Sequence, residues 1–209
     1  MAEHIVDLDT WPRAAQFQFF RTYDRPHYAT TVRIDVTRLI QVRKGQGVNV
    51  YRACLYAIGA GLHGVPELCM RFRGDHVVRH DGVALSMTVP TAAGAFNYAY
   101  VPYLHEFAAF DAQCSTLIAA AAETGTLGAN SGERDDVAYL SCMPWLDYTA
   151  INNAMPGPDD CIPRVSWGKI VPRGEGWDMA MTLEVHHALV DGAQVGAYFG
   201  AVQGALKAV

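Results

Sequence analysis

The C-terminal part of the chain changes from an alternating pattern of apolar and polar residues to a helical pattern. From Asp178 to His186 apolar and polar side chains largely alternate, which is typical of a β-strand with two different faces. From Val195 to Leu206 apolar residues recur at helical spacing, as on one face of an amphipathic helix. Continuing the strand alternation places His187 on the apolar face, where the chain turns from strand to helix.

The rest of the pattern predicts a layered arrangement of sheet and helices. Apolar residues at helical spacing predict helices over residues 50–62 and 104–122. The predicted strands are 28–36, 83–89, 95–101, 137–142 and 165–171, with a hairpin over 69–79 that turns at Gly74 and Asp75. Residues 124–136 and 152–163, rich in Gly, Asn, Asp or Pro, are predicted loops. No linker interrupts these elements, so we expect a single α/β domain over residues 1–209.

Composition narrows the classes of partner. The 209 residues are 51% hydrophobic, enough to bury a substantial core. A net charge of -5 with dispersed basic residues argues against nucleic acid and anionic membrane as partners. No apolar run is long enough to span a bilayer, and the first nine residues have no apolar signal segment. Five scattered cysteines are typical of reduced thiols, so we expect a cytoplasmic protein.

The His186-His187 pair admits several interpretations. The simplest is a pair of structural histidines, one solvated and one hydrogen-bonded in the core. A metal site would need a third ligand, and the chain has no His-Glu-x-x-His motif, so we expect no metal. Serine-hydrolase chemistry would need a Gly-x-Ser-x-Gly elbow, which is absent from the sequence. General-base catalysis by His187 remains, because a neutral imidazole suits proton transfer near neutral pH.

Segments far apart along the chain favour the catalytic interpretation. Trp11–Arg21 with Ile34–Leu39, Leu140–Trp145 and His186–Gly192 each resemble a signature of the chloramphenicol acetyltransferase family. Pro163–Lys169 is a weaker match to the strand before the last hairpin of that family. Their order and separations also fit, so the resemblance covers nearly the whole chain.

The resemblance implies a reaction and roles for individual residues. His187 would be the general base that takes the proton of an acceptor hydroxyl as its oxygen attacks the thioester of acetyl-CoA. Ser141 would donate a hydrogen bond to the oxyanion of the tetrahedral intermediate. Asp191, paired with Arg13, would hold the loop that carries His187, and Ser166 would bind an ordered water near the intermediate. Transfer would be direct, within a ternary complex of enzyme, acetyl-CoA and alcohol.

The resemblance also implies an architecture. Family members have a two-layer α/β sandwich in which helices pack on a mixed β-sheet, and they assemble as homotrimers. Their active sites lie between subunits, with the catalytic histidine from one subunit and most of the acceptor pocket from the next. Lys169 and Trp145 are expected to contact the coenzyme, and the other partner is a small-molecule alcohol.

The acceptor pocket departs from the family pattern. The residues expected to line it are Phe20, Tyr28, Phe96, Tyr98, Tyr139 and Ser166. Phe20 lacks the phenolic hydroxyl of the tyrosine found in several members, Tyr139 stands where asparagine is common, and Gly128 falls near a pocket phenylalanine. We therefore expect chloramphenicol, and hence antibiotic resistance, as the leading assignment, with another hydrophobic alcohol as an alternative.

Two other functions share this fold. One is the acyltransferase core of a 2-oxo acid dehydrogenase complex, which also has a His-x-x-x-Asp-Gly motif. Those proteins usually carry a lipoyl domain ahead of the core, whereas this chain opens directly with the Trp11–Arg21 signature. The other is a non-enzymatic binder of hydrophobic compounds, against which the presence of both His187 and Ser141 argues.

Overall fold

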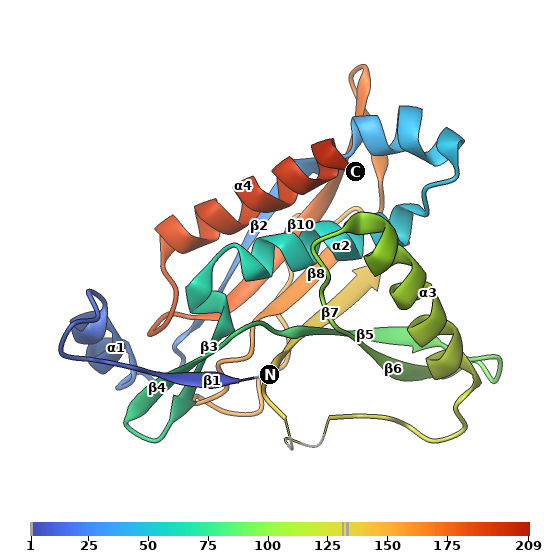
Figure 1. The fold of residues 1–209 in the computed structure, drawn as a ribbon. Helices are drawn as coiled ribbons and strands as arrows, with labels where there is room; N and C mark the ends of the chain where they lie inside the picture. The colour runs from blue at the N-terminus through green and yellow to red at the C-terminus, as the bar shows by residue number, and fades with distance from the viewer. Residues whose placement is uncertain (1, 131, 133) are drawn as a thin grey trace.

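A computed structural model describes residues 2–130, 132 and 134–209. Its strands are β1 (Glu3–Val6), β2 (His27–Asp35), β3 (Met70–Arg73), β4 (His76–His80), β5 (Ala84–Pro90), β6 (Phe96–Val101), β7 (Val137–Met143), β8 (Arg164–Gly168), β9 (Val171–Arg173) and β10 (Gly176–His186). Its helices are α1 (Ala14–Phe20), α2 (Val50–His63), α3 (Phe107–Glu123) and α4 (Gly192–Ala208), with single turns η1 (Leu39–Arg43), η2 (Lys44–Gln46) and η3 (Pro66–Cys69). Figure 1 shows their arrangement.

A mixed sheet forms the centre of the fold, as expected. Its strands follow the order β2-β10-β8-β7-β5-β6, and β9 pairs with the start of β10. β7 runs parallel to β5 and β8, whereas the β2–β10, β8–β10 and β5–β6 pairs are antiparallel. A smaller antiparallel sheet, β1-β4-β3, lies beside it.

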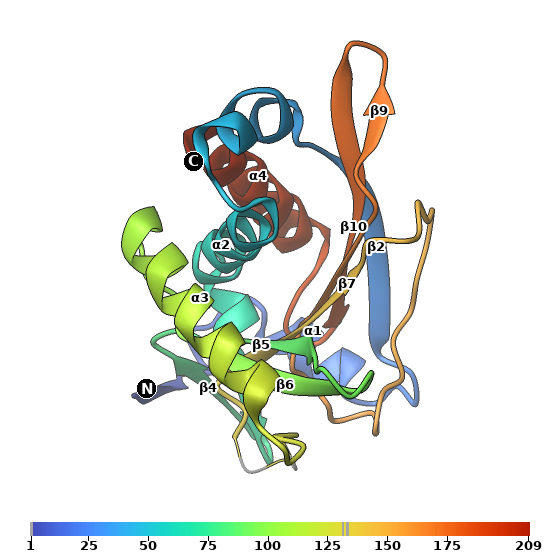
Figure 2. The same ribbon diagram turned by 90° about the vertical axis from the view of Figure 1, so that its right-hand side faces the viewer.

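Helices α2, α3 and α4 cover one face of the large sheet (Figure 2). The alternation of β10 explains this layer, because Met181 and Leu183 are buried in the apolar core beneath the helices. α2 and α4 pack so closely that a Cβ on Gly61 would lie 2.7 Å from the side chains of Tyr198 and Val202. No helix among the described residues is long and apolar enough to cross a membrane.

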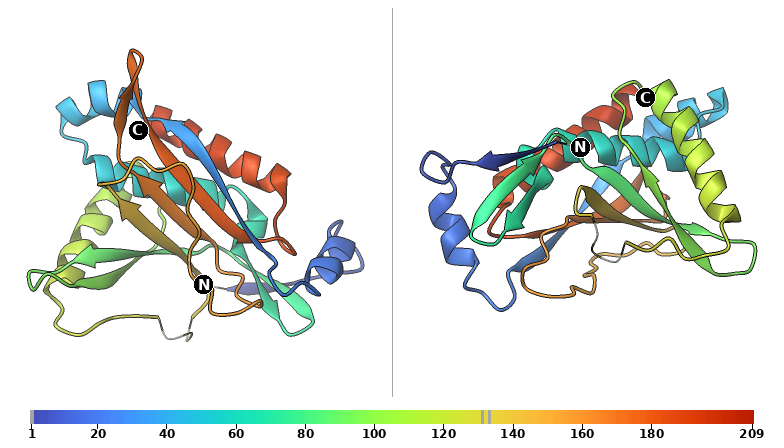
Figure 3. Two further views of the ribbon diagram at one scale, coloured as in Figure 1. Left: turned by 180° about the vertical axis from the view of Figure 1, so that it is seen from behind. Right: turned by 60° about the horizontal axis from the view of Figure 1, so that its bottom comes forward.

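The other face of the sheet is crossed by the strap, which we define as residues 144–163 between β7 and β8 (Figures 2 and 3). The Tyr148 hydroxyl donates to the backbone oxygen of Ser166 at 2.7 Å. A Cβ on Gly168 would lie 2.5 Å from the backbone oxygen of Leu146, so the strap rests directly on the end of β8. The strap therefore forms a second, irregular layer opposite the helices.

Most of the predicted elements are present, but the prediction of one strand is wrong. The hairpin turns at Gly74, which has a φ of 61°. The strand predicted over 165–171 is two strands, because after Gly168 the backbone N–H of Lys169 donates to Leu146 of the strap, and β9 pairs only with β10. The predicted 124–136 loop contains Ser131 and Glu133, which lie outside the described residues; its other residues form no helix or strand beyond the end of α3.

Candidate active site

The turn between β10 and α4 carries His187. Asp191 is the N-cap of α4, and its carboxylate accepts from the backbone N–H of Ala193 at 3.0 Å. The side-chain oxygen of Gln194 in return accepts from the backbone N–H of Asp191 at 3.2 Å. This reciprocal capping box arises from the local sequence Asp191 to Gln194 and fixes where the turn ends.

Hydrogen bonding orients the His187 ring. Its Nδ1 lies 3.2 Å from the carbonyl oxygen of Val190, and because a carbonyl only accepts, Nδ1 carries the proton. Nε2 of the neutral ring therefore keeps its lone pair. The Phe20 ring stacks on the imidazole with centroids 3.8 Å apart and planes 9° apart, and the Tyr28 ring lies 4.7 Å away. The half-buried imidazole is thus an oriented proton acceptor.

Arg13 binds this turn at three points. Its Nε donates to the backbone oxygen of Leu189 at 3.1 Å, its Nη2 donates to that of His187 at 3.3 Å, and its Nη1 donates to the Asp191 carboxylate. Arg13 is only 8% exposed. Although partial burial opposes it, the Ala193 N–H and the Arg13 guanidinium hold the pKa of Asp191 below its ordinary value. The predicted Arg13–Asp191 pair thus lies in contact, directly behind His187.

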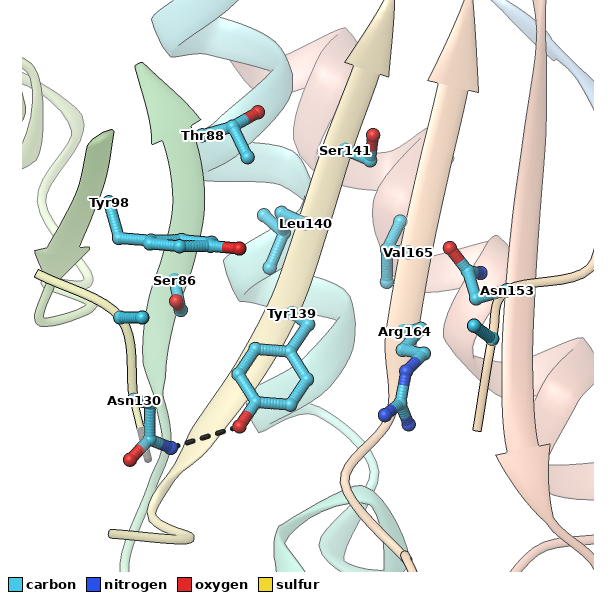
Figure 4. A pocket seen from close by; sticks show the side chains of 12 residues that line it. Ser86, Thr88, Tyr98, Asn130, Tyr139, Leu140, Ser141, Asn153, Arg164 and Val165 are labelled. Carbon is cyan, nitrogen blue, oxygen red and sulfur yellow. Dashed lines mark hydrogen bonds between the residues drawn. The ribbon is translucent and has the colours of Figure 1, made fainter. Parts of the chain in front are cut away.

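A cavity of about 270 Å³ opens on the strap side of the sheet (Figure 4). It is lined by Ser86, Thr88, Tyr98, Ala129, Asn130, Tyr139, Leu140, Ser141, Asn153, Ala154, Arg164 and Val165. Ser141 and Tyr139, two residues apart on β7, both line it, and the Asn130 amide donates to the Tyr139 hydroxyl at 2.9 Å. The cavity brings together three predicted residues, Ser141, Tyr139 and Tyr98.

The cavity and His187 are far apart within one chain. Ser141 pairs with Ser166 across β7–β8, and Ser166 pairs with Thr182 across β8–β10. His187 lies five residues after Thr182, just past the end of β10, and two strands away from β7. At about 3.3 Å per residue and 4.8 Å per strand, the α-carbons of His187 and Ser141 are roughly 20 Å apart. Groups that act on one reacting carbonyl must approach it to about 3 Å. One chain alone therefore cannot bring both to the same carbonyl.

The remaining predicted residues divide between these two places and a third. Ser166 is buried beside the cavity, and its hydroxyl has no hydrogen-bond partner within the described structure. Phe96 is half-exposed and contacts Tyr98 edge to face at 5.6 Å without lining the cavity. Lys169 and Trp145 follow the ends of the parallel strands β8 and β7, and Trp145 is 79% exposed.

A second hollow lies near Lys169. It has a volume of about 540 Å³ and is lined by Ile40, Lys44, Val48, Asn49, Val50, Tyr51, Ile170 and Trp177.

No group of three or more His, Cys, Asp or Glu side chains in the described part of the chain is placed to hold a metal ion.

Sequence reasoning missed several residues of these hollows. Arg164 could have been identified from the sequence, because a charged residue within a buried strand is unusual. Asn130 and Asn153 could not have been identified from the sequence, because both lie in irregular segments without periodicity. The same holds for Lys44, which lies in the single turns before α2.

A family model and individual relatives of known name all point to the same protein family. A family model described as "Chloramphenicol acetyltransferase" matches residues 1–203. The chain is 23% identical to chloramphenicol acetyltransferase of Bacillus pumilus, over 91% of this chain and 87% of the relative. It is 23% identical to chloramphenicol acetyltransferase 2 of Escherichia coli, over 95% and 94%.

Solved structures share the fold. A chloramphenicol acetyltransferase superposes with a TM-score of 0.91 at 24% identity, over 98% of this chain and 100% of that one. A probable dihydrolipoamide acetyltransferase from Listeria monocytogenes superposes with a TM-score of 0.69 at 14% identity, over 93% and 89%. A truncated catalytic core of the 2-oxoacid dehydrogenase multienzyme complex from Thermoplasma acidophilum superposes with a TM-score of 0.67 at 14% identity, over 98% of each chain, so this type of protein shares the fold with a poorer superposition.

Proposed function

Because the chain belongs to the chloramphenicol acetyltransferase family, we propose that it transfers the acetyl group of acetyl-CoA to a hydroxyl of chloramphenicol and so confers resistance to the antibiotic. The observation that carries this proposal is the His187 imidazole, whose Nδ1 is held by the Val190 carbonyl while Nε2 is left to accept a proton. Phe20 on one ring face and Arg13 behind the turn keep that orientation.

This geometry supports the following reaction. Nε2 of His187 removes the proton of the acceptor hydroxyl as its oxygen forms a bond to the thioester carbonyl carbon. The carbonyl oxygen becomes an oxyanion, to which the Ser141 hydroxyl donates a hydrogen bond. When the intermediate collapses, the carbon–sulfur bond breaks, the imidazolium returns its proton to the departing sulfur, and the acetyl ester and CoA are released.

We propose that the working unit is a homotrimer with each site built from two copies. The separation of His187 and Ser141 within one chain supports this, because a neighbouring copy is needed to bring an imidazole to the cavity beside Ser141. In a cyclic assembly one such heterologous contact repeats at every interface, so each trimer has three equivalent sites.

We propose that acetyl-CoA enters from the side of the second hollow. Tyr51 and Trp177 offer aromatic faces for an adenine ring, and the Lys44 ammonium suits a phosphate group. Lys169 and Trp145 lie at the ends of β8 and β7 nearby, which fits their proposed role as coenzyme contacts.

The test is the release of free thiol from acetyl-CoA with and without chloramphenicol. Release that requires the acceptor, and is abolished in a folded His187→Ala variant, supports the transferase. Binding of chloramphenicol without thiol release would favour the non-enzymatic binder. A fully active His187→Ala protein would exclude the proposed base.

A mixing experiment tests the shared site. His187→Ala and Ser141→Ala proteins are unfolded together, refolded as mixed oligomers and assayed. At equal amounts, random assembly gives about a quarter of the interfaces an intact pair, so activity should rise towards that fraction of the wild-type value. Mixtures no more active than the average of the two separate variants would contradict a site between copies.

A further inference from the structure

One wall of the cavity that contains Ser141 is rich in polar side chains. Tyr139, Arg164 and Glu184 lie side by side on neighbouring strands β7, β8 and β10, one register row beyond that of Ser141 on the same face. Arg164 and Glu184 are 8% and 4% exposed. Burying charged side chains is costly unless each is hydrogen-bonded, so the partners of these groups define what this wall offers to a ligand.

Glu184 fixes the orientation of Asn153, a strap residue that lines the cavity. One oxygen of Glu184, Oε2, accepts from the backbone N–H of Asn153 at 2.7 Å and from its side-chain Nδ2 at 2.8 Å. Because that oxygen acts as an acceptor, the side-chain atom beside it must be the NH₂ group. The amide oxygen of Asn153 then points away from Glu184, toward β7 and β8, as Figure 4 shows.

Arg164 does not offer a free positive charge to the cavity. Its Nη2 donates to the Asp160 carboxylate at 2.7 Å and its Nη1 to the backbone oxygen of Ile162 at 3.1 Å. Its guanidinium also lies over the Tyr139 ring, 5.3 Å from the centroid. With Arg164 matched by Asp160, the carboxylate of Glu184 behind Asn153 makes this wall unfavourable for an anion.

We propose that the acceptor of this enzyme is an alcohol that carries a second hydrogen-bond donor, and that Asn153 Oδ1 is the group that selects it. This inference rests on the proposed acetyltransferase function. Asn153 is the specificity-determining residue, and Glu184 is a positioning residue that acts through it. Chloramphenicol, with a second hydroxyl and an amide N–H, belongs to this class, whereas simple hydrophobic alcohols and anionic alcohols do not.

The probes are 3-phenylpropan-1-ol and three analogues with a hydroxyl, a methoxyl or a carboxylate on the benzylic carbon. The wild-type enzyme should prefer the hydroxyl analogue in kcat/KM by about tenfold over the parent, the usual net effect of one hydrogen bond. The methoxyl analogue, which accepts but cannot donate, and the carboxylate should gain nothing over the parent.

Substitutions distinguish a loss of the preference for the hydroxyl analogue from general damage to the protein. Asn153→Leu keeps about the size of the side chain but removes the oxygen, so the ratio of kcat/KM for the hydroxyl analogue and the parent alcohol should fall to about one. Asn152→Leu, at the exposed neighbouring position, is the matched control and should keep the preference. Glu184→Met should lose the preference by freeing the amide, and Glu184→Gln, which retains an oxygen acceptor, should restore it.

A wild-type enzyme that acetylates parent and hydroxyl analogue equally, or an Asn153→Leu enzyme that still prefers the hydroxyl analogue, would overturn the inference but leave the transferase intact. If no alcohol, chloramphenicol included, is acetylated, the proposed function fails instead. Calorimetric binding of the same two probes then decides the inference: tighter binding of the hydroxyl analogue that is lost in Asn153→Leu supports it, and equal binding refutes it.

Discussion

Replacing Arg13 by methionine should weaken the attachment of the turn that carries His187. The guanidinium forms three hydrogen bonds to this turn, two to backbone oxygens of His187 and Leu189 and one to the Asp191 carboxylate. Methionine has a similar length and fills much of the same space, so the change removes the hydrogen bonds with little loss of packing.

The expected loss of stability follows from the exposure of the partners. Removing one member of a fully buried ion pair costs about 3–5 kcal/mol. The Arg13 side chain is 10% exposed but the Asp191 side chain is 38% exposed, so water replaces part of the lost interaction. We expect a decrease of about 2–3 kcal/mol in the free energy of unfolding, or about 5–10 °C in Tm for a chain of this size. We also expect kcat to fall by about 10²-fold, the usual effect of a catalytic group displaced by about 1 Å.

Thermal unfolding and steady-state thiol release would be measured on Arg13→Met and wild-type protein at the same concentration, because oligomers gain stability by mass action. The matched control is Arg25→Met, an exposed arginine on the segment after α1, which should change stability by less than about 0.5 kcal/mol. An Arg13→Met protein with wild-type Tm and kcat would refute the view that this side chain holds the turn.

Two further predictions concern individual side chains. Ser141→Ala should lower kcat by about 10²–10³-fold with little change in the Kd for chloramphenicol, because the proposed role of its hydroxyl is to stabilise the oxyanion; an unchanged kcat would exclude that role. His186 lies between the strap and the turn: its Nε2 is 2.9 Å from the backbone oxygen of Pro158, and its Nδ1 accepts from the backbone N–H of Ala188. Burial, and to a lesser extent the neighbouring His27, lowers the pKa of His186 to about 4. The unfolded chain, in which histidine titrates near about 6.5, binds this proton first, so stability should decrease as pH falls from about 6.5 to 4, by up to about 1.4 kcal/mol per pH unit. His186→Gln should flatten that dependence in urea unfolding at several pH values, and an unchanged slope would contradict it.

The junction of β10 and α4 could be predicted because its information is local. Alternation identified the strand, helical spacing identified the helix, and Asp191 occupies the N-cap at their junction. The continued alternation also placed His187 on the apolar face, and in the structure its half-buried ring contacts that of Tyr28. Patterns of this kind depend only on which side of one element is buried.

Contacts between distant segments could not be predicted in this way. The Glu184–Asn153 contact joins a strand to an irregular strap 31 residues earlier in the chain. The break after β8 arises because the Leu146 carbonyl lies against Gly168, which no periodicity of the strand itself reveals. β1 was missed because its four residues are mostly exposed and show no apolar face, and α1 because it buries only Phe17.

The parallel stack of Phe20 on His187 has an electrostatic consequence at the moment of reaction. In the proposed reaction the ring takes a proton, and the resulting imidazolium cation lies face to face with an electron-rich π system 3.8 Å away. Such a cation–π contact stabilises the charged form by about 0.5–1 kcal/mol at a partly exposed position. Under the proposed mechanism, Phe20 therefore stabilises the positive charge that develops on His187 as the ester bond forms. An aliphatic side chain of equal bulk there would fill the space without that contribution.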